Sequence, residues 1–276
     1  MGRTQRAAGQ GSRLLNLKNR VVAITGASAG IGLAAARAFS KENARIAVAA
    51  RRRDRLDLLV REIEDAGREA FAVEADVSVE ADVRRFVDLT VRRYGQIDVM
   101  INNAGFGIRG RVEETAAQDF ERLMRTNYLG TVYGCQAALK HMRPRNEGVI
   151  LNVSSIVGHR SMPGGAAYGA SKAAQISLTE SLRVELQGTG IHVMSVHPIA
   201  TRTEFAEVAL KESSGRSGSP VGPMQTAEHV AEAMVRAVHR PRPEIHPYPM
   251  ARALVALNAI FPSLVDRWAG RGGKKS

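Results

Sequence analysis

Short apolar runs alternate with longer amphipathic segments along most of the chain. Six runs have the length and the continuous apolar character of buried strands: Val21–Ile24, Arg45–Ala50, Glu69–Val73, Ile97–Ile101, Gly148–Val153 and Ile191–Val196. The segments between them, such as Gly30–Glu42 and Arg55–Asp65, have helical periodicity. This alternation indicates an α/β fold, in which helices cover both faces of a parallel sheet. Ligands of such sheets bind beyond the carboxyl ends of the strands.

Length and composition fit one such domain. The chain has 276 residues, of which 44% are hydrophobic, so it can bury a substantial core. Its single cysteine, Cys135, lies in an apolar run and cannot form an internal disulfide, which favours a buried inert thiol and a reducing cytoplasm. We find no signal peptide and no apolar stretch long enough to span a bilayer.

The formal charge of +12 suggests a nucleic-acid partner, but its distribution argues against one. Residues 1–20 hold five basic and no acidic residues, and residues 267–276 hold four basic and no acidic residues. The remaining body has 30 basic and 27 acidic residues and is nearly balanced. Solvated basic tails therefore explain the charge better than a phosphate-backbone or anionic-membrane role.

A glycine-rich turn, Thr25-Gly-Ala-Ser-Ala-Gly-Ile-Gly32, follows the first strand and opens a helix. Glycines let the backbone turn tightly and let a pyrophosphate reach the first free N–H groups of the helix. A purely structural turn is the alternative. The position of this turn after the first strand of a strand–helix–strand unit favours a dinucleotide site.

The second strand ends in Arg51-Arg-Arg-Asp-Arg55, where NAD-binding sites usually carry an acidic residue for the ribose 2′-hydroxyl. A guanidinium can grip a 2′-phosphate with paired hydrogen bonds, whereas a carboxylate would repel it. We therefore predict NADP(H) rather than NAD(H), with Arg51 as the first contact and Arg52 or Arg55 next. The alternative is a solvated helix start, in which Asp54 partly neutralises the cluster.

Tyr168 and Lys172 are four residues apart, so a helix places a phenol and an ammonium on one face. Ser155 stands 13 residues upstream of the tyrosine, and Asn127 lies further back. A nearby cation favours the phenolate, so we expect Lys172 to lower the pKa of Tyr168. Packing or capping would explain any one of these residues, whereas the set and the glycine turn together predict hydride and proton transfer.

The motifs follow one order along the chain: Thr25 to Gly32, Asp76-Val77, Asn102-Asn-Ala-Gly105, Asn127, Asn152-Val-Ser-Ser155, Tyr168 to Lys172, and Pro198 to Thr203. In these motifs, over residues 18–250, the chain resembles the short-chain dehydrogenase/reductase family. The resemblance implies a single-domain, Rossmann-type doubly wound parallel sheet of about seven strands flanked by helices. It also implies an oxidoreductase that acts on CH–OH donors with NAD(P)⁺ as acceptor.

The resemblance also implies the roles of individual residues. Tyr168 would be the general acid and base, Ser155 would donate to the substrate oxygen, Lys172 would also bind the nicotinamide ribose, and Asn127 would hold a water that links Lys172 to solvent. Ser154 is chemically equivalent to its neighbour, so only the spacing favours Ser155. No metal ligand is expected. The implied cofactor contacts are Gly26, Ser28, Gly30, Ile31, Gly32, Arg51, Arg52, Asp76, Val77, Asn102, Ala104, Gly105, Tyr168, Lys172, Ile199 and Thr203.

One position departs from the family pattern. Family members usually have Pro-Gly where this chain has Pro198-Ile199. A β-branched side chain restricts the backbone and narrows the space beside the nicotinamide. We expect this change to alter the local geometry and to leave the catalytic set intact.

The expected organisation has three parts: a basic tail over residues 1–18, the dehydrogenase domain over residues 19–249, and a C-terminal extension over residues 250–276. The Ser- and Gly-rich segment within residues 204–225 is either a substrate lid or a surface loop. In the extension, apolar residues recur at steps of three and four from Met250 to Trp268, with an interruption at Pro262. This stripe would pack on the parent domain or a twin subunit, or else meet an anionic membrane as a peripheral contact.

The sequence thus predicts a cytoplasmic NADP(H)-dependent enzyme, a homodimer or homotetramer, that interconverts a carbonyl and a secondary or primary alcohol. Phe106, Ile108, Met162 and Phe205 favour an apolar substrate. The alternatives are a protein that senses NADPH without turnover and a membrane-associated dehydrogenase of the steroid or retinoid type.

Overall fold

The computed structural model describes residues 16–205, 209 and 223–272. Most of the predicted basic tail, residues 1–18, lies outside the described residues, as do most of the 204–225 loop and residues 273–276.

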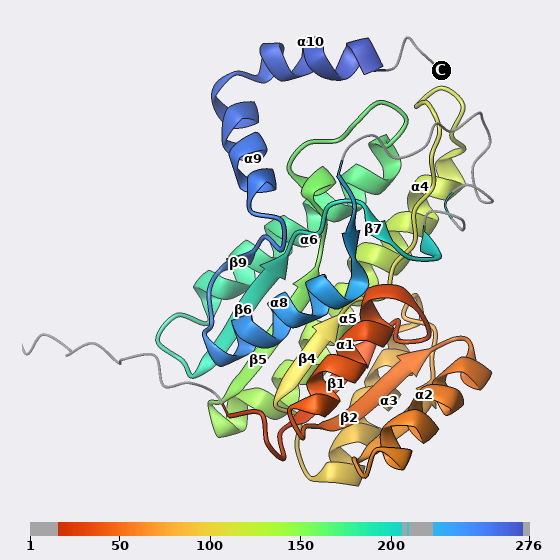
Figure 1. The fold of residues 1–276 in the computed structure, drawn as a ribbon, viewed down its shortest axis with the longest axis vertical. Helices are drawn as coiled ribbons and strands as arrows, with labels where there is room; N and C mark the ends of the chain where they lie inside the picture. Colours follow the sequence, from red (N-terminus) through yellow and green to blue (C-terminus); the bar gives the residue numbers. More distant parts are fainter. Residues whose placement is uncertain (1–15, 206–208, 210–222, 273–276) are drawn as a thin grey trace, which may run out of the picture.

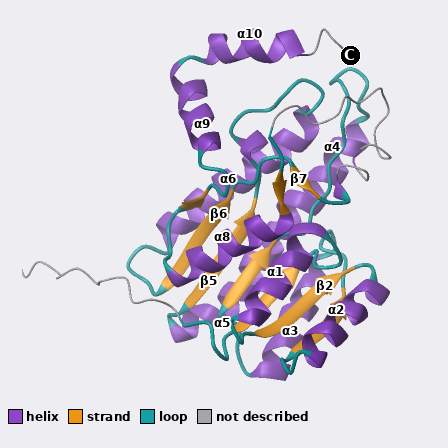
Figure 2. Cartoon of the chain, in the orientation of Figure 1, coloured by secondary structure: helices purple, strands orange, loops and turns teal. Residues whose placement is uncertain are grey.

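Seven parallel strands form the central sheet (Figures 1 and 2). In chain order they are β1 (Val21–Thr25), β2 (Arg45–Ala50), β3 (Ala70–Glu74), β4 (Val99–Asn102), β5 (Gly148–Val153), β6 (Ile191–Val196) and β9 (Glu244–Ile245). In space their order is β3-β2-β1-β4-β5-β6-β9, and every neighbouring pair is parallel. The predicted doubly wound sheet is confirmed. The strand order reverses between β1 and β4, and ligands of such sheets bind beyond the carboxyl ends at that point.

Helices cover both faces of the sheet (Figure 1). They are α1 (Gly30–Lys41), α2 (Arg53–Asp65), α3 (Glu80–Tyr94), α4 (Ala117–Leu123), α5 (Gly130–Met142), α6 (Ala166–Glu185) and α8 (Ala227–His239). Alternate strand residues face opposite layers, so Val22 and Ile24 join the core beneath α1, α2 and α8, whereas Ala23 joins the core beneath α3, α5 and α6. Because both faces of the sheet are covered, all residues of β1 are buried.

The sequence pattern did not indicate the seventh strand, β9. It has only two residues, which pair with Ser195 and Val196 of β6. Pro243 and Pro247 lie close to its ends, and a strand this short shows no periodicity. A second small sheet pairs β7 (Thr201–Arg202) with β8 (Gln225–Thr226), so the chain after β6 is tied to the start of α8.

The C-terminal extension forms α9 (Met250–Ile260) and α10 (Pro262–Gly272), which extend beyond the carboxyl end of the sheet (Figure 1). The predicted interruption at Pro262 is confirmed, because this residue begins the second helix. Val265 and Ala269 are buried, whereas five members of the apolar stripe are exposed: Met250, Leu254, Leu257, Phe261 and Leu264. Within the part of the chain that the structure describes, no helix combines the length and apolar character needed to cross a bilayer.

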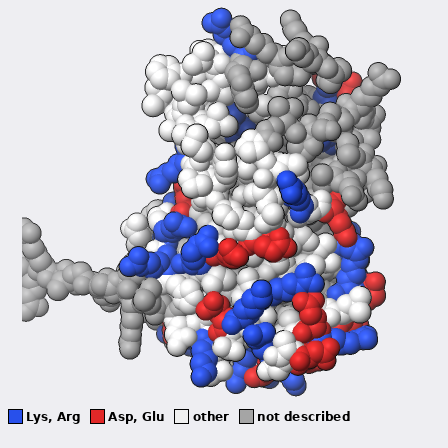
Figure 3. Space-filling view, in the orientation of Figure 1, with Lys and Arg blue, Asp and Glu red and all other residues white. Residues whose placement is uncertain are grey.

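Acidic and basic side chains lie intermixed over the half of the molecule that carries α1 and α2, and the surface toward α9 is mostly uncharged (Figure 3). Several of these charges form ion pairs, such as Arg37 with Glu62 at 2.7 Å and Arg45 with Glu69 at 3.1 Å. The intermixing agrees with the nearly balanced charge of the body in the sequence.

Candidate active site

The glycine-rich turn joins β1 to α1 and has the backbone that its sequence requires. Gly26 and Gly30 have φ angles of +69° and +56°, a region that favours glycine. A Cβ on Gly32 would lie 2.4 Å from the Gly26 carbonyl oxygen, so the turn packs too closely for any side chain there. Ala29 precedes the helix and gives it no side-chain cap, which leaves the first N–H groups of α1 for an anion.

Asn103 holds this turn against the end of β4, a role that the sequence analysis missed. Its Nδ2 donates to the carbonyl oxygens of Thr25 and Gly26 at 2.9 and 3.2 Å. The Thr25 hydroxyl in turn accepts from the backbone N–H groups of Asn103 and Ala104, at 3.1 and 3.2 Å. The glycine turn and the Asn102–Gly105 motif are therefore one structural unit. Thr203 also reaches it, because a Cβ on Gly30 would meet the Thr203 methyl group at 3.0 Å.

The arginines after β2 are not equivalent. Arg52 donates to the Ser28 hydroxyl at 3.0 Å and pairs with Glu204 at 2.9 Å. Arg55 also pairs with Glu204, and both arginines lower the pKa of that carboxyl through their hydrogen bonds. Glu204 is a partner that the sequence analysis missed, since it lies about 150 residues away along the chain.

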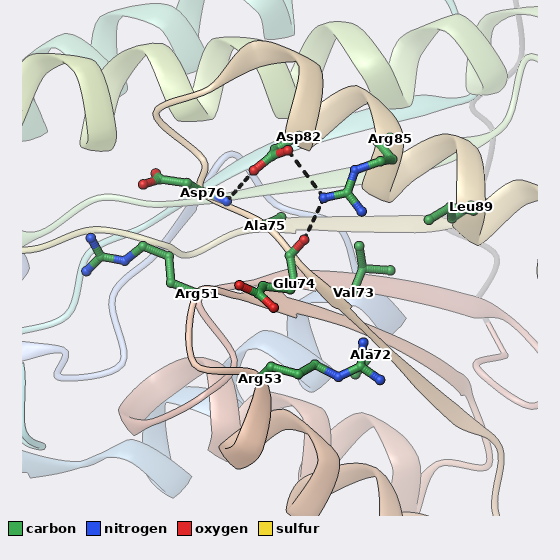
Figure 4. A pocket seen from close by; sticks show the side chains of 10 residues that line it. All are labelled: Arg51, Arg53, Ala72, Val73, Glu74, Ala75, Asp76, Asp82, Arg85 and Leu89. Carbon is green, nitrogen blue, oxygen red and sulfur yellow. Dashed lines mark hydrogen bonds and ion pairs between the residues drawn. The ribbon is translucent and has the colours of Figure 1, made fainter.

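Arg51 instead lines a cavity of about 440 Å³ beyond the carboxyl ends of β2 and β3. Arg53, Glu74, Asp76 and Arg85 also line it, and Figure 4 shows Arg51 and Arg53 on the side opposite Asp82 and Arg85. Arg53 pairs with Asp57 at 2.8 Å. Among the described residues, no carboxylate forms an ion pair with Arg51, so of the four arginines it is the best placed to meet an anionic ligand.

Asp76 and Val77, which were both expected to contact the cofactor, differ in position. Asp76 lines the cavity, and its carboxylate accepts from the N–H and hydroxyl of Ser78 at 2.9 and 2.8 Å. Val77 is buried and lies against Gly130, where an added Cβ would meet its side chain at 3.0 Å.

Tyr168 and Lys172 lie on one face of α6, as their spacing predicted. Lys172 is 4% exposed, and its Nζ donates to the Val153 carbonyl at 2.8 Å and lies 5.7 Å from the centre of the Tyr168 ring. Burial lowers the pKa of Lys172 to about 7, because the ammonium has lost most of its contact with water.

The prediction that Lys172 lowers the pKa of Tyr168 is wrong for this structure, because the pKa is raised. Desolvation raises the pKa of the phenol above its ordinary value, and the neighbouring Ser155 hydroxyl acts in the opposite direction without reversing the shift. The same burial weakens the charge on Lys172 that was expected to stabilise the phenolate. Tyr168 therefore remains protonated at neutral pH.

Ser155 rather than Ser154 faces the tyrosine. Ser154 is buried, and its hydroxyl donates to the backbone carbonyl of Lys172 at 2.8 Å. The hydrogen bonds of the Ser155 hydroxyl with the backbone are long: it donates to the Pro198 carbonyl at 3.4 Å and accepts from the Val157 N–H at 3.3 Å. It can turn toward a substrate oxygen at little cost.

Asn127 lies in a π-helix, η1 (Met124–Leu129), between α4 and α5. Irregular turns of this kind occur frequently at functional sites. Its fully buried carboxamide accepts from the Phe106 N–H at 3.0 Å and donates to the Phe106 carbonyl at 3.0 Å and the Ser171 hydroxyl at 2.9 Å. Both of its N–H donors are thus in use. Ser171, which also donates to the Tyr168 carbonyl at 2.7 Å, is a second supporting residue that was missed.

Gly105 connects the catalytic residues with the glycine turn. A Cβ there would lie 2.9 Å from Oδ1 of Asn127 and 3.6 Å from Nζ of Lys172. Asn102 differs from its neighbours, because its side chain donates to Asn152 at 2.8 Å inside the core. Any contact of Asn102 with a cofactor would run through its backbone. Ile199 is partly buried, and its carbonyl accepts from the Thr201 hydroxyl at 2.9 Å.

Apolar side chains surround the tyrosine. The Phe205 and Tyr168 rings lie 5.4 Å apart, and Phe106 and Phe120 pack with Tyr168 around the buried Ile108 and Leu123. Gly107 permits this packing, because a Cβ on it would meet the Phe205 ring at 2.8 Å. Of the four residues predicted to favour an apolar substrate, Phe106, Ile108 and Phe205 therefore lie in the apolar group around Tyr168.

Comparison with protein families and curated proteins agrees with this geometry. The family model for short chain dehydrogenases matches residues 20–213. An uncharacterized oxidoreductase of Bacillus subtilis, YxnA, is 34% identical over 92% of this chain and 72% of its own length. An 11-beta-hydroxysteroid dehydrogenase of Pinus massoniana is also 34% identical, over 93% of this chain and 74% of its own.

Solved structures match over nearly the whole chain. A short-chain dehydrogenase/reductase from Burkholderia phymatum in complex with NAD superposes with a TM-score of 0.84 at 26% identity, over 91% of this chain and 96% of that one. A short-chain dehydrogenase from Sphingobium yanoikuyae in complex with NADPH gives 0.77 at 29% identity, over 90% and 95%. With its ordered motifs, its sheet and these relatives, the chain belongs to the short-chain dehydrogenase family of oxidoreductases.

Proposed function

We propose that the protein interconverts an apolar ketone or aldehyde and the corresponding alcohol, with NADP(H) as cofactor and Tyr168 as general acid and base. The observation that carries this proposal is the convergence of Tyr168, Lys172 and Ser155 beside Gly105. Gly105 belongs to the segment that packs on the glycine turn. A cofactor bound along that turn would thus end beside the proton donor.

Each residue has a distinct task in this proposal. Bound NADPH would supply a hydride to the carbonyl carbon of the substrate. The Tyr168 O–H donates its proton to the carbonyl oxygen, so a C–H and an O–H bond form and the alcohol results. The Ser155 hydroxyl donates a hydrogen bond to the same oxygen and stabilises the charge that develops on it. The reverse direction runs through the same groups.

The two pKa shifts support the direction of proton flow. A pKa raised by burial keeps Tyr168 protonated at neutral pH, which is the form that a reduction requires. Lys172, with its pKa lowered to about 7, exchanges protons readily near neutrality and can return a proton to the phenolate. Asn127, whose carboxamide is fixed by Phe106 and Ser171, would hold the water that connects Lys172 to solvent.

The position of Arg51, directly after β2, supports NADP(H) over NAD(H) as the cofactor. Arg51 lines the cavity beyond β2 and β3 where the adenosine half of a dinucleotide would lie. Arg52 lies beside Ser28 of the glycine turn and would be a second phosphate contact. The structural neighbours include a complex with NAD as well as complexes with NADP and NADPH, so the neighbours alone do not decide the preference.

Two further features support the expected oligomeric state and the expected location in the cell. The exposed apolar residues of α9 and α10 favour a homodimer or homotetramer, with a peripheral membrane contact as the alternative. Flotation with anionic liposomes separates these two, since a homo-oligomer without lipid affinity stays in the soluble fraction. Burial raises the pKa of the Cys135 thiol to about 12, and such an inert thiol suits a cytoplasmic enzyme.

The decisive experiment is an NADPH-oxidation screen over ketones, aldehydes, steroids and 3-oxoacyl thioesters, with Tyr168→Phe as the matched variant. We expect at least one apolar carbonyl to be reduced, and the variant to lose about 10²- to 10⁴-fold in kcat while binding NADPH nearly as well. Unchanged turnover in Tyr168→Phe would contradict the role of the phenol. NADPH binding without turnover of any carbonyl would favour the sensing alternative.

A further inference from the structure

Three histidines meet at the carboxyl ends of β5, β6 and β9, outside the residues of the proposed reaction. His197 directly follows β6, His246 directly follows β9, and His159 follows η3 (Ile156–Gly158), the short 3₁₀ helix after Ser155. The backbone N–H of His197 donates to the Ile245 carbonyl at 2.8 Å, which places His197 beside His246, the residue after Ile245. The order of the strands therefore gathers residues that are far apart in the sequence.

The three imidazole rings form one group. His197 lies between the others, with ring centres 4.5 Å from His159 and 4.8 Å from His246. One nitrogen of each histidine lies within 4.8 Å of those of the other two. His197 is completely buried, and the other two are partly buried.

Two of the three rings form hydrogen bonds with neighbouring polar side chains. Nε2 of His197 bonds to the Ser195 hydroxyl at 2.8 Å, and Nε2 of His246 bonds to the Glu244 carboxylate at 3.0 Å. Within the described residues, Nδ1 of His197, Nδ1 of His246 and Nε2 of His159 are buried and have no hydrogen-bond partner. Most buried polar atoms are paired, so three unpaired nitrogens in one place need an explanation.

The arrangement matches that of metal-binding histidines. A histidine that binds a metal through one nitrogen usually donates its other N–H to a carboxylate, a carbonyl or another oxygen, which fixes the tautomer. Glu244 with His246, and Ser195 with His197, supply such partners.

The protonation state of the cluster also suits a metal. Burial, with smaller effects from His159 and His246, lowers the pKa of His197 to about 3, while Glu244 and the Ser155 backbone act in the opposite direction. Burial likewise lowers the pKa of His159. Neutral imidazole is the form that binds metal ions.

We propose that His159, His197 and His246 bind one divalent transition-metal ion of the Zn²⁺ type. Three imidazole nitrogens are a common ligand set for Zn²⁺, with water in the fourth position. Bonds of about 2.0–2.1 Å place tetrahedral ligand nitrogens about 3.3 Å apart, so the rings turn inward on binding. His159 in a loop and His246 beyond a two-residue strand have the freedom to do so.

Such an ion would join three segments near the active site. His159 belongs to the turn that carries Ser155, and His197 precedes Pro198, whose carbonyl accepts from the Ile156 N–H at 3.0 Å. His246 precedes α9 by only a few residues. The ion would thus fix the Ser155 turn and the base of the C-terminal extension to the edge of the sheet. It would have a structural role that is independent of the proposed reaction.

The test is a Zn²⁺ titration of the full chain, prepared without a polyhistidine tag and stripped with a chelator, in competition with a chromogenic chelator. We expect one Zn²⁺ per chain and a melting temperature that rises with Zn²⁺. Both effects should be lost in His159→Ala and in His246→Ala. His192→Ala is the matched control, because His192 is an exposed histidine near the other end of β6, and it should behave as the wild type.

Two further measurements keep the test decisive. Co²⁺ should give the d–d absorption of a nitrogen-ligated site in the wild type and not in the more conservative His246→Gln, whose metal-free circular dichroism reports on its fold. Glu244→Gln should weaken Zn²⁺ binding about 10-fold. Zn²⁺ binding that is absent, or equal in the wild type and the His159→Ala/His246→Ala double variant, would overturn the proposal and leave stacked neutral imidazoles that only pack.

Discussion

The strand order reverses between β1 and β4, and the ionisable side chains at the carboxyl ends of the strands differ on the two sides of this point. On the β1-β2-β3 side the ionisable groups are exposed or half-buried and mostly paired, as in Arg52 with Glu204 and Arg53 with Asp57. On the β4-β5-β6-β9 side Lys172 and His197 are buried and Tyr168 is partly buried, and loss of contact with water shifts the pKa of all three.

This difference separates recognition from proton chemistry. Exposed arginines keep their charge, so they can bind an anionic part of a ligand but cannot exchange protons near neutrality. Buried groups with shifted pKa values can exchange protons or bind metals, at a cost in stability when they are charged. Changes on the buried side should therefore alter kcat and stability, and changes on the exposed side should alter the KM for the cofactor.

The largest effect should come from Lys172→Met, which keeps the length of the side chain and removes its charge. We expect kcat to fall by about 10²- to 10⁴-fold, because the phenolate of Tyr168 loses its proton source. Steady-state NADPH oxidation measures this loss. A variant that retained more than a tenth of the wild-type kcat would contradict the proton path through Lys172.

The same substitution should make the cofactor-free protein more stable at neutral pH. The unfolded lysine has its ordinary pKa near 10.5, whereas burial lowers the folded value to about 7. Between these values the unfolded chain binds more protons, so the wild type gains stability as pH rises, by a few kcal/mol at most. Lys172→Met lacks the ionisable group and therefore lacks this pH-dependent contribution to stability. The melting-temperature difference between the variant and the wild type should shrink from pH 7 to pH 10, and a constant difference would contradict the shifted pKa.

Features that depend on local sequence were predicted, and features that depend on the packing of distant segments were not. Gly26, Gly30, Tyr168 and Lys172 were predicted because their chemistry depends on local turn geometry and helix spacing, which a linear sequence preserves. The rise in the pKa of Tyr168 was not predicted, since it depends on how completely neighbouring segments exclude water.

Long-range partners were hidden for a related reason. Glu204, Asn103 and the three clustered histidines act through contacts that only the strand order and the returning chain create. No periodicity or short motif marks such residues. The two-residue strand β9, which positions His246, is itself too short to be detected from the sequence.

On the exposed side, Arg51→Ala should have an intermediate effect that is confined to the cofactor. The loss of charged hydrogen bonds worth about 1.5–3 kcal/mol corresponds to a rise of about 10- to 100-fold in the KM for NADPH. The KM for NADH and the kcat should change little. Arg53→Ala is the matched control, because Arg53 lines the same cavity but pairs with Asp57. An unchanged KM for NADPH in Arg51→Ala would remove this residue from the proposed phosphate site.

The smallest effect should come from Glu204→Gln. Glu204 accepts from both Arg52 and Arg55 beside the glycine turn, and its negative charge opposes the binding of a phosphate there. Exposed ion pairs contribute at most about 1 kcal/mol, so freeing the two arginines should lower the KM for NADPH by no more than about 5-fold. The KM for NADH should not fall by the same factor, because NADH has no 2′-phosphate. An equal change for both cofactors would mean that Glu204 orders the segment after β7 rather than setting the charge of the site, and the exposed side would then influence the cofactor through its geometry as well as its charge.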